Sequence, residues 1–183
     1  ESLLNSKPQR ATLESLGFRF GISGPHAART MMLDELRLLL AHTGPNSFGK
    51  DFMEAILTRN LLGKPTSKAR ELTHRHLRML YGLDSANPIF RALRRLWPLS
   101  EAAQPMLALS AALARDPLLR ATQDFILGHP IGAAVSREAV ERFLAQTYPD
   151  RFSPASLKSF AQNVAGTWTA AGLLCGHRNK TRS

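Results

Sequence analysis

The side chains of this chain that could perform catalysis are few and poorly placed for it. His74 and His76 lie two residues apart, so on a helix their rings would point about 160° apart and could not share a metal ion. Cys175 has His177 close by, but no carboxylate lies nearby to orient that imidazole. The sequence contains no phosphate-binding glycine loop and no His-Glu-x-x-His motif. We therefore predict a protein that is not an enzyme and that uses no cofactor, metal ion or small-molecule substrate.

The basic side chains, by contrast, are concentrated in two segments. Residues 60–98 carry eight Lys and Arg against two acidic residues, and residues 151–183 carry five against none. These segments contribute +6 and +5 to a chain whose formal net charge is +10. Clustered positive charge creates a local field that attracts polyanions, nucleic acids above all. A nuclease that holds Mg²⁺ with clustered carboxylates is disfavoured, because the first segment contains only Glu71 and Asp84.

The hydrophobic pattern predicts an all-α protein of about eight helices, because apolar residues recur at three- and four-residue spacing. Glycine and proline separate the helical segments. The expected helices cover residues 29–42, 47–59, 67–81, 87–97, 105–115, 117–127, 136–148 and 153–171. Residues 1–28 would form an N-terminal arm and 29–98 a helical part that contains a helix-turn-helix. Residues 99–183 would form a helical C-terminal part, packed with the former as one compact unit.

The helix expected over residues 67–81 is the first candidate site. It follows a shorter helix and a turn that contains Gly63, which is the shape of a helix-turn-helix unit. In such units the second helix enters the major groove of DNA, and arginine can bind guanine with two hydrogen bonds. The plainer alternative is a solvated face, but a helix built only for solubility usually mixes both signs of charge. The predicted DNA contacts are Lys64, Ser67, Lys68, Arg70, His74, Arg75 and Arg78, with Arg91, Arg94 and Arg95 from the next helix.

The C-terminal part is the second candidate site. The helices expected over 117–127, 136–148 and 153–171 would form a three-helix unit of the winged-helix kind. Leu173–Cys175 would be a short strand, the start of a wing cut short by the end of the chain. Lys158 and Gln162 project from the last helix, and glutamine can read adenine. The alternative for this helix is packing in a polar-lined core. The tail, with its three basic residues, is expected to touch phosphate or to be disordered.

Several segments resemble the BrxA-like accessory proteins of BREX phage-defence systems. They are RTMMLDELRLLL, AILTRNLLGKPTSKARELTHRHLRMLY, PIFRALRRLW, RDPLLRATQDFIL and SPASLKSFAQNVAGTWTAAGLL, and they span nearly the whole chain after residue 28. The resemblance implies an all-helical, DNA-binding, non-catalytic protein encoded beside a methyltransferase and other defence proteins, which would be possible partners. The residues that match the family's helix-turn-helix segment are Lys64, Ser67, Lys68, Arg70, Arg75 and Arg78.

The remaining features favour a cytoplasmic protein without a membrane partner. The single cysteine, Cys175, allows no intramolecular disulfide. The longest nearly uncharged apolar run, residues 105–114, is about half of the roughly 20 residues that a membrane span requires. Double-stranded DNA is therefore the predicted partner. Two alternatives stay open: an RNA-binding helical module, and a scaffold whose basic face docks an acidic protein.

Overall fold

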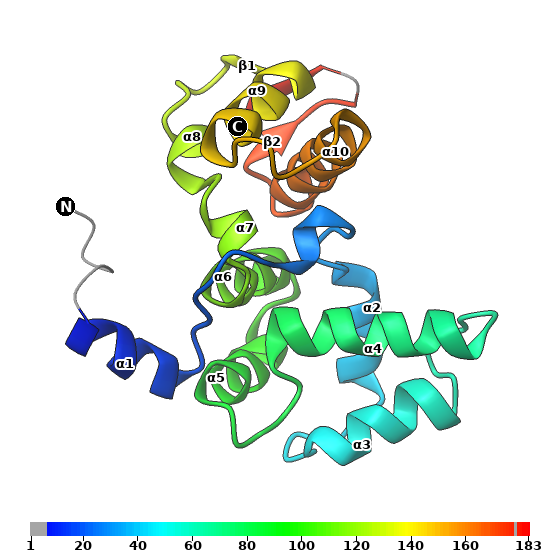
Figure 1. Cartoon of the computed structure of the whole chain (residues 1–183). Helices are drawn as coiled ribbons and strands as arrows, with labels where there is room; N and C mark the ends of the chain where they lie inside the picture. Colours follow the sequence, from blue (N-terminus) through cyan, green and yellow to red (C-terminus); the bar gives the residue numbers. More distant parts are fainter. Residues whose placement is uncertain (1–6, 178) are drawn as a thin grey trace.

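The computed structural model of the chain describes residues 7–177 and 179–183. It confirms the predicted mostly helical fold (Figure 1). The first half contains α1 (Lys7–Leu16), α2 (Leu33–Ala41), α3 (Gly49–Met53), the π-helical turn η2 (Glu54–Thr58), α4 (Ser67–Tyr81) and α5 (Pro88–Leu96). The second half contains α6 (Gln104–Arg115), α7 (Pro117–Arg120), α8 (Gln123–Leu127), α9 (Arg137–Thr147) and α10 (Pro154–Ala170). Short 3₁₀ turns are η1 (Pro25–Ala27), η3 (Trp97–Leu99) and η4 (Glu101–Ala103).

The helix boundaries follow from local capping chemistry. The Thr66 side chain accepts a hydrogen bond from the Ala69 amide at the start of α4, and Ser136 and Ser153 cap α9 and α10 in the same way. Helix α4 ends at Gly82, whose φ of 89° is a left-handed conformation that glycine adopts without strain. These signals depend on a few adjacent residues, so α4 has the bounds that the sequence predicted.

Tertiary hydrogen bonds override two of the predicted helices. The helix expected over residues 117–127 is interrupted, because the buried Thr122 hydroxyl donates to the Leu119 carbonyl and accepts from the Trp168 indole nitrogen. The helix expected to begin at residue 29 is α2, which begins at Leu33. The Met31 amide donates to Thr167 Oγ1 at 2.8 Å, and this contact with α10 holds the preceding segment outside the helix.

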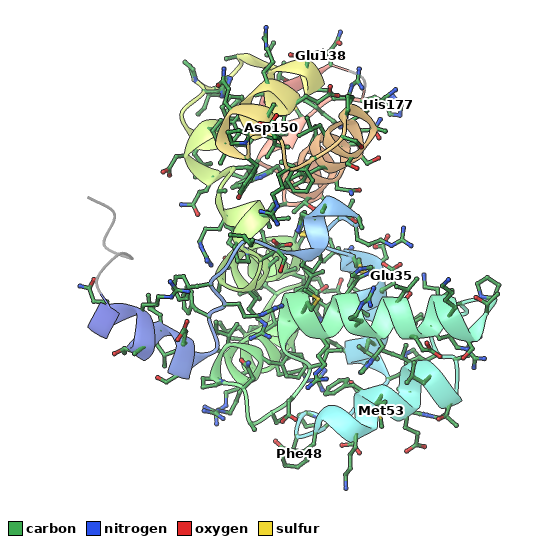
Figure 2. All side chains as sticks on the ribbon, in the orientation of Figure 1. Glu35, Phe48, Met53, Glu138, Asp150 and His177 are labelled. Carbon is green, nitrogen blue, oxygen red and sulfur yellow. The ribbon has the colours of Figure 1, made fainter. Side chains whose placement is uncertain are left out.

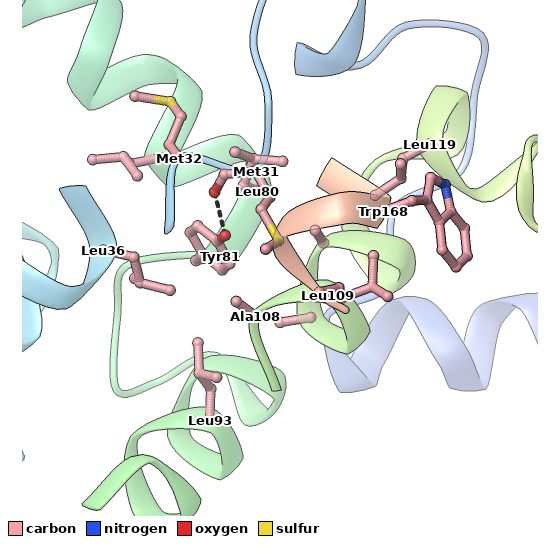
Figure 3. Close-up of a cluster of buried hydrophobic side chains, with 14 of the residues drawn as sticks. Met31, Met32, Leu36, Leu80, Tyr81, Leu93, Ala108, Leu109, Leu119 and Trp168 are labelled. Carbon is pink, nitrogen blue, oxygen red and sulfur yellow. Dashed lines mark hydrogen bonds between the residues drawn. The ribbon is translucent and has the colours of Figure 1, made fainter. Parts of the chain in front are cut away.

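One hydrophobic core joins the two halves of the chain (Figure 3). Helix α6 packs against α4 and α5 and also contacts α7 and α10. Tyr81 at the end of α4 is fully buried, and its hydroxyl donates to the Met31 carbonyl. Burial, followed by the influence of Glu35, raises the pKa of Tyr81 well above its usual range. Trp168 lies beside Leu119 and anchors α10 to the same core.

The last residues of the chain pair with a short strand before α9 to form a small antiparallel sheet, which contacts α10. Its strands are β1 (Ala134–Val135), β2 (Leu174–Cys175) and β3 (Lys180–Arg182), in the order β1-β3-β2. Thr181 lies opposite both Ala134 and Cys175. A strand, two helices and a returning hairpin in this order have the connectivity of a winged helix. The predicted wing is therefore present, but the expectation that the chain ends before completing it was wrong, because β3 returns and pairs with β2.

Candidate nucleic-acid interface

The N-terminal end of α4 has little free basic charge. The Lys64 amine forms an ion pair with Glu35 Oε1 at 3.0 Å, beside α4 in Figure 2. Arg70 folds back, and its Nη1 donates to the Leu57 carbonyl of η2 at 2.8 Å. The Ser67 hydroxyl donates to Glu71 Oε1. Of the four DNA contacts predicted at this end, only Lys68 is exposed and lacks a partner among the described residues.

The arginines of α5 are divided between packing and solvent. Arg94 donates from Nη1 to the Leu40 carbonyl at 2.9 Å and from Nη2 to the Thr43 carbonyl at 2.8 Å. These bonds satisfy carbonyl groups at the C-terminal end of α2, and burial lowers the pKa of Arg94. Arg91 and Arg95 are both exposed, and Arg91 Nη1 donates to the Ser85 carbonyl. Arg94 therefore stabilises the fold.

The C-terminal half of α4 presents the rest of the predicted basic set. Arg75 and Arg78 are exposed, and His74 is half-buried beside them. Burial, and then the charge of Arg78, lower the pKa of His74 and so disfavour its charged form. All three line an open hollow of about 580 Å³. His76, two residues along α4, is buried.

Helix α10 has one face in the core and an open N-terminal half. Phe160, Val164 and Trp168 are buried. Polar packing also occurs, as the sequence allowed: the Asn163 amide donates to the His26 carbonyl at 3.2 Å. The exposed residues of the first three turns are Pro154, Ala155, Ser156, Lys158, Ser159 and Gln162. Both predicted contacts on this helix, Lys158 and Gln162, are therefore accessible.

A groove of about 450 Å³ runs between α10, the start of α9 and the wing. Gln162 and Gly166 line it from α10, and His177 and Lys180 line it from the wing. Figure 2 shows Glu138 and His177 at the same end of the molecule, far from Glu35. Glu138 also lines this groove, where it forms an ion pair with Arg137 at 2.6 Å. Its own backbone amide, followed by Arg137, holds the pKa of Glu138 below its usual range.

The basic residues beside α10 have different roles. Arg151, in the turn before α10, stacks over the rings of Tyr148 and Phe152 at 5.2 and 5.0 Å. Lys180 donates to the Gly176 carbonyl within the wing, and Arg182 Nη1 donates to the Leu173 carbonyl at 3.0 Å. Arg182 thus supports the sheet. The third basic residue of the predicted tail, Arg178, lies outside the described residues.

A buried polar network that the sequence did not indicate joins the N-terminal segment to α7 and α10. His26 Nδ1 lies 2.7 Å from Asp116 Oδ2, and His26 Nε2 lies 2.8 Å from Thr167 Oγ1. This order of carboxylate, imidazole and hydroxyl matches that of a catalytic triad. All three residues have no exposed surface, so no substrate can reach the hydroxyl group. We interpret the network as a structural element.

Other kinds of site find no support in the part of the chain that the structure describes. It contains no group of three or more His, Cys, Asp and Glu that could hold a metal ion. None of its helices is long and apolar enough to cross a membrane. A scan against protein-family models and a search of curated proteins found no match for this chain. The resemblance to the BREX accessory proteins therefore stays a prediction.

Proposed function

We propose that this protein binds double-stranded DNA through α10 and the β2–β3 wing. The observation that carries the proposal is the winged-helix connectivity combined with the open N-terminal half of α10. In helix-turn-helix proteins the N-terminal residues of the second helix contact base edges. Here those turns carry Lys158 and Gln162, and residues 151–183 contain no acidic residue.

The chemistry of the exposed α10 surface fits the major groove. A helix with its side chains is about 10–12 Å wide, close to the width of this groove in B-DNA. Ala155 and Ser159 are small, so the helix backbone can approach the base edges closely. Gln162 can then pair with adenine through two hydrogen bonds. The exposed Lys158 can contact a phosphate beside the groove, which adds affinity without sequence information.

The proposal moves the base contacts from α4, where the sequence placed most of them, to α10. Lys64, Arg70 and Arg94 have intramolecular partners and are left out of the proposed interface. An accessory role in phage defence, with other defence proteins as partners and a cytoplasmic location, is part of the proposal. The role in phage defence is supported by the resemblance of the sequence segments to BREX accessory proteins. The cytoplasmic location is supported by the single cysteine.

Competition between duplex DNA and duplex RNA of equal length tests the proposed partner. The major groove of A-form RNA is deep and narrow, so α10 cannot enter it. We expect duplex RNA to compete about tenfold or more weakly than DNA for a labelled DNA duplex at one salt concentration. Equal or stronger competition by RNA would favour the RNA-binding alternative. Binding to neither, together with a protein partner that survives nuclease treatment, would favour the scaffold.

A further inference from the structure

An arginine-lined hollow lies at the C-terminal end of α4, away from the α10 groove. Helix α4 crosses the lower part of Figure 1 and its end meets α6, whereas α9 and the strands lie at the top. The arginines that line the hollow come from three separate parts of the chain. Arg19 follows α1, Arg75 and Arg78 belong to α4, and Arg115 ends α6. The hollow has a volume of about 580 Å³, within the usual range for small-ligand sites.

The positive charge of this hollow is poorly compensated. Arg115 is only 8% exposed, and it donates to the carbonyl groups of Met79, Arg78 and Gly17. Carbonyl groups satisfy its N–H groups but supply no negative charge. Burial, followed by the charges of Arg19 and Arg78, lowers the pKa of Arg115 to about 10. A bound anion would relieve this repulsion.

Asp84, the one carboxylate among the described residues that line the hollow, already accepts hydrogen bonds from backbone amides. Asp84 Oδ2 accepts from the Gly49 amide at 3.1 Å, and Oδ1 accepts from the Ala86 amide at 2.8 Å. The side chains of Arg19, Arg75 and Arg78 make no hydrogen bond or ion pair with any residue that the structure describes. Three guanidinium groups are therefore available to a ligand, with the buried charge of Arg115 behind them.

We propose that this hollow binds phosphate groups, most readily two adjacent ones. The planar fork of arginine matches phosphate oxygens with paired hydrogen bonds, and three such forks suit a diphosphate better than a single carboxylate. Among the described residues that line the hollow, only Met79 and Ala86 have apolar side chains, whereas four are arginines, so a charged ligand fits this site better than a hydrophobic one. The phosphate groups can come from a free phosphorylated molecule or from the backbone of a nucleic acid.

Calorimetric titration with inorganic pyrophosphate, at fixed ionic strength, tests the proposal on the full chain. The test variant is Arg75→Gln/Arg78→Gln, because both side chains are exposed and the fold does not use them. The matched control is Arg59→Gln, an exposed arginine outside both candidate surfaces. We expect saturable binding to the parent and to the control, and about tenfold or more weaker binding to the test variant.

A second measurement identifies the source of the phosphate. If pyrophosphate does not bind but the test variant alone loses about tenfold in DNA affinity, the hollow holds backbone phosphates and the proposal stands. The phosphate-site proposal fails if pyrophosphate binds the parent and the test variant equally. It also fails if the substitutions weaken neither pyrophosphate binding nor DNA binding. The ligand-free test variant should melt no lower than the parent, because removing two charges relieves Arg115. DNA binding through α10 is measured with other variants, so failure here leaves that proposal intact.

Discussion

Replacing Asp116 with alanine is expected to lower the free energy of unfolding by about 3–5 kcal/mol. Asp116 has no exposed surface, and its Oδ2 accepts from both the amide and the imidazole of His26 at 2.9 and 2.7 Å. Its Oδ1 accepts from the Leu118 and Leu119 amides and so caps α7. Alanine would leave these buried donors without partners. Urea unfolding followed by circular dichroism gives the free energy.

The control for this prediction is Asp124→Ala, which removes an exposed aspartate from the neighbouring α8. That change should alter stability by no more than about 0.5 kcal/mol. An ordinary hydrogen bond contributes about 1 kcal/mol to stability. If Asp116→Ala lowers the free energy of unfolding by less than this, the buried network does not hold the N-terminal segment, α7 and α10 together.

The same network predicts a pH dependence of stability. Burial alone raises the pKa of Asp116, but the hydrogen bonds and charge of His26 outweigh it and hold the pKa below the usual value. A carboxyl group with a lowered pKa in the folded state stabilises the fold above its unfolded pKa, near 3.9, and this contribution is lost as pH falls further. Acid should therefore destabilise the parent more steeply below about pH 4 than it destabilises Asp116→Ala.

The second large effect is expected for Lys158→Glu/Gln162→Glu. Both residues are exposed on α10, so the change should leave the fold intact. It removes one phosphate contact and one base contact and places two carboxylates against the DNA, and we expect about a hundredfold loss of affinity for a duplex. Fluorescence anisotropy with a labelled duplex measures this loss, and circular dichroism checks the fold.

Two further variants make this prediction specific. Arg59→Glu reverses an exposed charge outside both candidate surfaces and should change affinity less than about threefold at moderate salt. Lys68→Glu reverses the free charge at the start of α4. If Lys68→Glu abolishes binding while the α10 variant binds like the parent, the interface lies on α4, as the sequence first indicated, and the α10 proposal fails.

Local sequence signals predicted most of the helices but not what interrupts them. The Thr66 cap and Gly82 bracket α4, and the helical period of 3.6 residues puts Lys68, Arg75 and Arg78 on one side, where all three are exposed. The break at Thr122 depends on a hydrogen bond from Trp168. The strand β1 has two residues and pairs with β3 near the end of the chain, so it has no alternating pattern to recognise.

The candidate sites were predictable only in part, because tertiary contacts decide which basic side chains are free. Arg70 and Arg75 belong to the same helix, yet the first reaches the Leu57 carbonyl and the second points to solvent. Helical spacing alone cannot reveal that Leu57 lies within reach. Arg19 and Arg115 meet α4 through folding of distant segments, so the charge count of residues 60–98 could not include them.

The most direct test of the central claim is a salt titration of DNA binding by the parent protein. Fluorescence anisotropy with a labelled duplex of about 20 base pairs gives the dissociation constant at each salt concentration. If the protein neutralises about four to six phosphates, the plot of log affinity against log salt should have a slope of about −4 to −5. A slope near zero, or no binding at low salt, would contradict the claim that this basic protein binds DNA.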